Sequence, residues 1–200
     1  MVKTLPTAYL PPVSYVVALL SGGAEDGGPC IEQWESYQKQ TLRNRCYIDS
    51  PDGPIPLTIP VRHDGTRLVR DIRLSDHGHW RRQHWQALRS SYAASPFFDF
   101  YQDDLRPVYE GNQRFLIDFN EEILIACLRL IDIPLTIRRT TSFQGPTAVP
   151  PPAELPPYYH VFGPERWPAN AVKASNLSVV DLLFNMGPES LLFFDVAPVV

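Results

Sequence analysis

The chain has 200 residues, of which 44% are hydrophobic and 20% charged, and its formal net charge at pH 7 is −4. This length and composition fit one well-buried globular domain and are short for two. The negative charge argues against a nucleic-acid-binding protein, which would be basic. The 21 prolines, about twice the usual share, exclude a simple helical bundle.

The cysteines and the apolar runs indicate the compartment. Cys30, Cys46 and Cys127 are widely spaced and form no C-x-x-C pair, so neither a disulfide framework nor a zinc site is expected. Prolines interrupt the N-terminal apolar residues, which therefore do not resemble a secretory signal. The longest apolar runs, 13–20 and 116–130, are too short or too charged to span a bilayer. We expect a soluble, cytoplasmic protein with buried free thiols and no integral membrane segment.

The first quarter of the chain alternates between strand and helix patterns. Residues 5–10 are predicted to form a strand that two prolines end, and Pro12 suits the first turn of a helix over 13–20. The glycine-rich residues 22–28 are predicted to form a turn, and 30–34 a second strand.

A β-hairpin is predicted next. Residues 45–48 and 55–61 flank a turn that contains Asp52 and Gly53, the dipeptide typical of tight hairpin turns. Two prolines in the second arm indicate an edge strand or a bulge. A further strand is predicted over 69–74.

Three helices follow, over 80–94, 97–109 and 114–130. In the first, four residues recur at four-residue spacing and therefore share one face: Trp80, His84, Leu88 and Tyr92. The third has the clearest apolar face and is predicted to be a core helix. Residues 135–140 are predicted to form a final strand.

The C-terminal part contains a proline-rich loop and a short helix. Residues 146–157 favour an extended, polyproline-like excursion. A helix over 177–186 is predicted because Ser178 and Asp181 resemble a capping box, and a Gly-Pro pair ends it.

The most unusual segment is cationic and precedes the hairpin. Lys39, Arg43, Asn44 and Arg45 lie within seven positions of a chain that has 3 Lys and 15 Arg. Arginine offers bidentate donors to phosphate or carboxylate, so this segment is a candidate binding site for an anionic small molecule. The alternative is an exposed loop whose arginines pair with acidic residues of the chain.

Two further candidates lie on the first and last predicted helices. His84, next to Gln83 and between two tryptophans, is a candidate general acid or base. The alternative is a satisfied core histidine, one whose ring donates a hydrogen bond to a backbone carbonyl within an aromatic core. Asp181 and Asn185 are one turn apart on an apolar helix, so their polar side chains face either water or a functional site. Their alternative roles are a helix cap and a C-terminal turn.

A fourth candidate is the junction between the first strand and the first helix. Tyr9 and Tyr15 flank the two prolines there, and a helix start presents backbone N–H groups that can bind an anion. The chain has no Walker loop, G-x-G-x-x-G, G-x-S-x-G or H-E-x-x-H motif, so no standard cofactor or metal signature is present.

In several stretches, which run in the same order along the chain, the sequence resembles the WbqC-like protein family, in particular its Bacteroidetes type. The matching stretches are 9–15, 32–48, 54–61, 80–92, 95–98 and 177–189. The resemblance implies a role in bacterial surface-polysaccharide (O-antigen) synthesis, such as transfer of an amino-acid or acyl group to a sugar.

We therefore expect a single α/β (or α+β) domain over residues 1–200, with a mixed β-sheet covered by three to five helices. The C-terminal helix is expected to return to the N-terminal strand and to close a cleft over the cationic segment. The expected function is a transferase that acts on a nucleotide- or lipid-linked sugar or an acyl or aminoacyl donor.

Within that transferase, Lys39, Arg43 and Arg45 would hold the anionic donor, and His84 would move the proton. Asp181 and Asn185 would orient the acceptor. The alternative is a non-catalytic binding or assembly protein that recognises an anionic glycan precursor or a partner protein, which the proline-rich loop favours.

Overall fold

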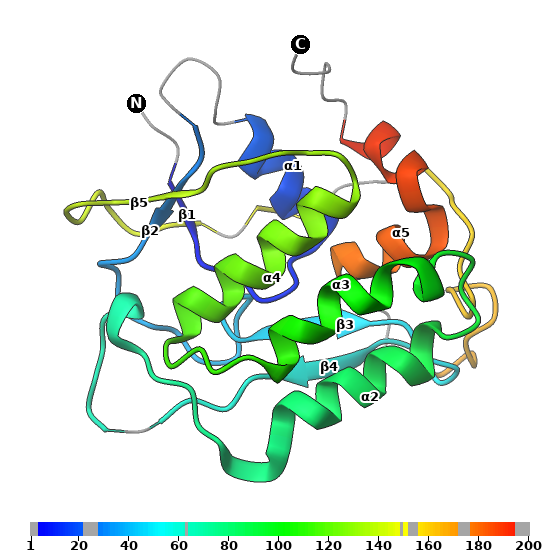
Figure 1. Cartoon of the computed structure of the whole chain (residues 1–200), viewed down its shortest axis with the longest axis horizontal. Helices are drawn as coiled ribbons and strands as arrows, with labels where there is room; N and C mark the ends of the chain where they lie inside the picture. The colour runs from blue at the N-terminus through cyan, green and yellow to red at the C-terminus, as the bar shows by residue number, and fades with distance from the viewer. Residues whose placement is uncertain are drawn as a thin grey trace.

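The computed structural model describes residues 4–21, 28–62, 64–148, 150–151, 156–171 and 177–194 (Figure 1). Its helices and strands are, in chain order, β1 (Thr4–Pro6), α1 (Val13–Ser21), β2 (Cys30–Glu32), β3 (Arg45–Ile48), β4 (Ile55–Thr58), η1 (Val69–Asp71), η2 (His77–His79), α2 (Trp80–Tyr92), α3 (Phe98–Glu110), α4 (Leu116–Leu130), β5 (Arg138–Arg139), α5 (Val179–Met186) and η3 (Gly187–Phe193). These elements confirm the predicted α/β class. One continuous hydrophobic core reaches from Leu5 to Phe194, as a single domain requires.

The strands form two small sheets instead of one mixed sheet. In the first, β1, β2 and β5 pair in parallel, with Leu5 opposite Ile31 and Ile31 opposite Arg139. In the second, β3 and β4 form the predicted antiparallel hairpin. Gly53 has a φ of 103° in the connecting turn, a conformation that glycine adopts without steric cost.

The helices form most of the core. α2 packs against α3, and α3 against α4, and Figure 1 shows these three helices side by side. The α2 face that carries Trp80, His84, Leu88 and Tyr92 is buried, as the four-residue spacing predicts. Among the described residues, none of the helices combines the length and apolar character needed to cross a lipid bilayer.

The C-terminal helix returns to the N-terminal strand region, as predicted. Ser178 caps α5 by accepting a hydrogen bond from the backbone N–H of Val180. Val179 donates a backbone hydrogen bond to Pro11, and Ser178 donates one to Tyr47 at the end of β3. These bonds place the first turn of α5 next to the end of the hairpin.

Several predicted elements differ in the structure. Residues 69–74 do not form a strand, because Val69 and Arg70 donate backbone hydrogen bonds to Glu35 and Gln33 and the chain turns there as η1. Strand 5–10 ends at Pro6, and strand 135–140 is reduced to β5.

Two further predictions fall wholly or partly outside the described residues. The turn at 22–28 lies outside them except for Gly28. The loop at 146–157 lies partly outside them, and its described residues have no regular secondary structure.

Candidate functional site

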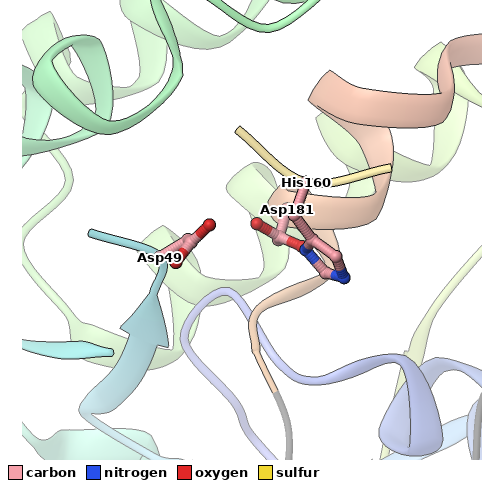
Figure 2. A group of neighbouring side chains, drawn as sticks. All are labelled: Asp49, His160 and Asp181. Carbon is pink, nitrogen blue, oxygen red and sulfur yellow. The ribbon is translucent and has the colours of Figure 1, made fainter. Parts of the chain in front are cut away.

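Three ionisable side chains from distant segments meet beside the first turn of α5 (Figure 2). Asp49 follows β3, His160 lies in an irregular segment, and Asp181 lies in the first turn of α5. One N or O atom from each lies within 4.8 Å of the others. Both aspartates have 0% exposure, and the His160 side chain has 14%. The cluster is therefore buried, with His160 nearest to solvent.

Asp49 is held by N–H groups of the segment that follows His160. Its Oδ2 accepts hydrogen bonds from the backbone N–H of Gly163 (2.8 Å) and Phe162 (3.2 Å), and its Oδ1 accepts one from the Trp167 indole (2.7 Å). Burial raises the pKa of Asp49 and the nearby Asp181 adds to the rise, whereas the hydrogen bonds from Gly163, Trp167 and Phe162 oppose it. Asp49 therefore fastens this segment to the hairpin.

Asp181 is surrounded by hydroxyl and amide groups. Its Oδ2 accepts a hydrogen bond of 2.7 Å from the Tyr158 hydroxyl. The Asn185 amide donates to the Asp181 backbone carbonyl (2.8 Å), and the Asn185 Oδ1 accepts a hydrogen bond from Ser95 (3.1 Å). The two helix residues that the sequence singled out thus act together, with Asn185 holding the helix turn that presents Asp181.

Tyr92 connects the backbone of Asp49 with the side chain of Asp181. Its hydroxyl oxygen accepts a hydrogen bond of 3.0 Å from the backbone N–H of Asp49, and its side chain also interacts with Asp181. Burial, and then the negative charge of Asp181, raise the Tyr92 pKa well above its ordinary value of 10. Tyr92 therefore keeps its proton and serves as a donor inside the cluster.

His160 is the side chain best placed to move a proton. Its Nδ1 lies 2.9 Å from Oδ2 of Asp181, although its N–H direction is not aligned for an ideal hydrogen bond, and its ring packs on Tyr158 with centroids 4.1 Å apart. Burial alone would lower the His160 pKa. Contact with Asp181 and the charges of Asp49 and Glu165 outweigh burial, so the pKa lies above its ordinary value of 6.5.

The contacts of the cluster favour an acid–base pair over a metal site. Two carboxylates and one imidazole form a ligand set that divalent cations accept. However, both oxygens of Asp49 already accept N–H groups, and Nδ1 of His160 faces Asp181 at hydrogen-bond distance. Among the described residues, one ion pair lies within this cluster, between His160 and Asp181. The cluster therefore resembles an acid–base centre in which a carboxylate supports a histidine.

The cationic segment lies elsewhere, and its most buried member has an internal partner. Arg43 is 1% exposed, and its Nε donates to Oε1 of Glu35 at 2.9 Å. Its remaining guanidinium donors reach Glu35, Thr41 and Thr147. Pairing with an acidic residue of the chain is what the alternative interpretation expects of Arg43, although that interpretation placed the arginines in an exposed loop and Arg43 is buried.

The other predicted members of the cationic segment have varied surroundings. Asn44 is buried and donates to the backbone carbonyl of Ile59 (3.0 Å), Arg45 donates to the Thr58 hydroxyl (2.9 Å), and Lys39 is exposed. Asn44 therefore ties the segment to the residue after β4, and Lys39 is the member that solvent reaches most freely.

His84 lies in an aromatic network under α2. Its Nδ1 is 2.9 Å from the Tyr9 hydroxyl, which is itself 2.9 Å from the Tyr109 hydroxyl, and its ring packs edge-on against Trp80. Burial lowers the His84 pKa to about 4, and a hydrogen bond with the backbone of Thr58 opposes this only partly. His84 is therefore neutral at physiological pH, which favours the interpretation as a satisfied core histidine.

The remaining predicted residues do not converge on the acid–base cluster. Gln83 is exposed on α2, and Tyr15 is fully buried with its hydroxyl donating to the carbonyl of Pro6 (2.6 Å). Between described residues, no hydrogen bond or ion pair joins Arg43, His84 and Asp181 to one another. The return of α5 to the N-terminal strand region is confirmed, and its closure over the cationic segment stays a prediction.

Comparison with known proteins assigns the chain to a family. A family model described as the WbqC-like protein family matches residues 30–148, more than half of the chain, so the chain belongs to this family. Searches of curated proteins and of solved structures each returned no match. The matched residues include Asp49 and end before His160 and Asp181.

Proposed function

We propose that this member of the WbqC-like family is a transferase in the synthesis of bacterial surface polysaccharide, such as O-antigen. Its donor would be an activated compound, either a nucleotide- or lipid-linked sugar or an acyl or aminoacyl donor. The observation that carries the proposal is the pairing of His160 with the buried carboxylate of Asp181. An acceptor hydroxyl or amine loses a proton as it attacks such a donor, and a histidine supported by a carboxylate is suited to accept it.

Each residue of the cluster then has a distinct role. Neutral His160 accepts the proton of the acceptor, and Asp181 stabilises the imidazolium that forms. Tyr158 and Asn185 hold Asp181 in place from its side chain and its backbone. Asp49 holds the segment that carries His160. The pair acts as one base, because each member depends on the other for orientation and charge.

A ligand screen tests the transferase proposal directly. The full chain is heated with nucleotide sugars, acyl donors or aminoacyl adenylate analogues, and the midpoint of thermal unfolding is measured. A donor at 100 times its dissociation constant stabilises the folded state by about 2.7 kcal/mol. Donors that raise the midpoint are then incubated with sugar acceptors, and product is measured. If no class of donor both binds and reacts, the proposal is wrong.

Turnover should rise with pH. The base is the neutral form of His160, and its pKa lies above 6.5 because contact with Asp181 and the charges of Asp49 and Glu165 outweigh burial. The rate should therefore increase through a midpoint above 6.5, measured as kcat/KM against pH. Protonated His160 stabilises the folded state, so the same group contributes stability below pH 6.5 that is lost as pH rises through the folded pKa. A rate that falls over this range would contradict the role of His160 as base.

Replacing His84 by alanine should affect folding and leave turnover intact. The substitution removes a buried partner of the Tyr9 hydroxyl and opens a cavity under α2, so the free energy of unfolding should fall by about 1–3 kcal/mol. It is measured by urea unfolding, and kcat/KM is corrected for the folded fraction. A stable variant without turnover would show instead that His84 is the proton shuttle that the sequence indicated.

A binding or assembly role is the second candidate. Asp49 accepts three N–H hydrogen bonds and Asp181 accepts the Tyr158 hydroxyl, so the same cluster also fastens the segment around residues 158–167 to the core. In that case His160→Gln would lower stability, ligands from the screen would still bind, and no donor would be turned over.

A further inference from the structure

Arginines gather on one face of a protein whose net charge is negative. Seven of the 15 arginines line two adjoining clefts: Arg62, Arg73, Arg81, Arg82, Arg89, Arg106 and Arg114. The carboxylates in the two linings are those of Asp76 and Glu110. The cleft along α2 and the C-terminal end of α3 has a volume of about 510 Å³, and its neighbour has about 430 Å³. Each has the size of a small-molecule site.

Arg81 lies between the two clefts and lines both. Its guanidinium donates to the Gln113 side chain (2.9 Å) and backbone carbonyl (3.0 Å), and it packs 4.9 Å from the rings of Trp80 and Phe119. These hydrogen-bond and ring partners are neutral and hold the guanidinium in place, and the carboxylates of Asp76 and Glu122 act on its charge without a direct ion pair between described residues. A positively charged group is thus fixed at the junction of the clefts.

Backbone pairing brings three more arginines together in the second cleft. The N–H of Arg62 donates to the carbonyl of Arg73 (2.9 Å), and the N–H of Leu74 donates to the carbonyl of Arg114 (2.9 Å). Arg62 approaches Asp76 only to 3.7 Å, with both side chains largely exposed. Like charges side by side destabilise a fold, and an anion bound between them would remove that cost.

The first cleft adds aromatic surface to its arginines. Trp80, Trp85 and Tyr109 all line it, and Trp85 is half-buried between α2 and α3. Flat aromatic side chains suit the ring of a base or a sugar, whereas the second cleft offers arginines without aromatic side chains.

We propose that the two clefts together bind a phosphorylated ring compound of nucleotide size. Its phosphates contact Arg62, Arg73 and Arg114 with Arg81 at the junction, and its ring lies against Trp85. This site is separate from the acid–base cluster. Arg81 and Tyr92 occupy opposite ends of α2, which separates them by roughly 16 Å at 1.5 Å per residue. The proposal concerns binding and stands whether or not the cluster is catalytic.

Isothermal titration of the full chain tests the proposal. The probes are UDP, ADP, pyrophosphate, uridine and adenosine. At least one nucleoside diphosphate should bind more tightly than pyrophosphate, which lacks the ring, and at least tenfold more tightly than its own nucleoside, which lacks the phosphates. Absence of binding by both diphosphates and pyrophosphate at millimolar concentration would overturn the proposal, and so would a nucleoside that binds as tightly as its diphosphate.

Matched arginine substitutions locate the site. Arg73→Ala and Arg114→Ala should each weaken diphosphate binding at least tenfold, because each removes a charged donor from an exposed position in the second cleft. Arg129→Ala removes the same charge from an exposed position in the last turn of α4 and should change affinity less than twofold. Equal losses in all three variants would mean that only the general charge of the protein attracts the ligand. His160→Gln should keep diphosphate binding, so a failed transferase proposal would leave this result unaffected.

Discussion

Replacing Arg43 by methionine is expected to lower the free energy of unfolding by about 3–5 kcal/mol, the range seen when one partner of a buried ion pair is removed. Arg43 is 1% exposed and Glu35 is 4% exposed, and the guanidinium is the cationic partner of that carboxylate in the structure. Methionine fills much of the volume but leaves the Glu35 charge with only hydroxyl and N–H partners from Thr147. Urea unfolding of the wild type and the variant measures the difference.

Two further variants separate the ion pair from other effects. The double variant Glu35→Leu with Arg43→Met removes both charges and should be more stable than Arg43→Met alone, because no buried charge remains unpaired. Arg45→Ala, two residues on, loses one hydrogen bond to Thr58 at a partly exposed position and should cost about 1 kcal/mol. If Arg43→Met keeps its stability and loses ligand affinity instead, Arg43 binds the ligand as the sequence alone suggested.

The helices could be predicted because their signals are local. The spacing of Trp80, His84, Leu88 and Tyr92 places them on one face of α2, and all four are buried. Ser178 at the start of α5 caps the helix as its side chain predicts. By contrast, η1 depends on backbone bonds to Gln33 and Glu35, and no pattern within residues 69–74 encodes partners more than 30 positions away.

The role of the cationic segment could not be predicted from its composition. A dense group of donors indicates a site only if the chain does not already supply acceptors. Glu35 lies eight residues before Arg43, and Thr147 comes from more than a hundred residues beyond it. The meeting of the buried Arg43 and Glu35 with the partly buried Thr147 follows from tertiary packing, which the sequence pattern does not contain.

Only part of the acid–base cluster could be predicted from the sequence. Asp181 and Asn185 stood out because they are polar on an apolar helix, and both are buried in the structure. Asp49 directly follows a predicted strand, a position where polar groups often gather, but this signal alone is common. His160 lies in an irregular segment between prolines, where no periodicity marks a functional side chain. Hydrogen bonds from Phe162, Gly163 and Trp167 to Asp49, and from the Tyr158 hydroxyl to Asp181, bring this segment and its histidine to Asp181.

Replacing Asp181 by asparagine is expected to lower kcat/KM by about 10²–10⁴-fold, the range that positioned acid–base groups contribute. Asparagine has nearly the same shape and can still accept the Tyr158 hydroxyl, and Asn185 bonds to the backbone of residue 181, so the fold is retained. The lost charge no longer stabilises protonated His160. Since burial lowers the His160 pKa and contact with Asp181 opposes it, the midpoint of the pH profile should also move down.

Glu165→Gln provides the matched control for this variant. Glu165 is exposed and also raises the His160 pKa, but its effect is weaker than that of Asp181. Its removal takes away the same charge without touching the base, so kcat/KM should change less than threefold and the pH midpoint should move less.

If Asp181→Asn and Glu165→Gln leave turnover equally unchanged while only Asp181→Asn unfolds more easily in urea, the cluster fastens the fold. If only Asp181→Asn loses turnover and its pH midpoint also shifts, the charge of Asp181 acts on His160. A purely structural contact would not move the midpoint of a pH profile.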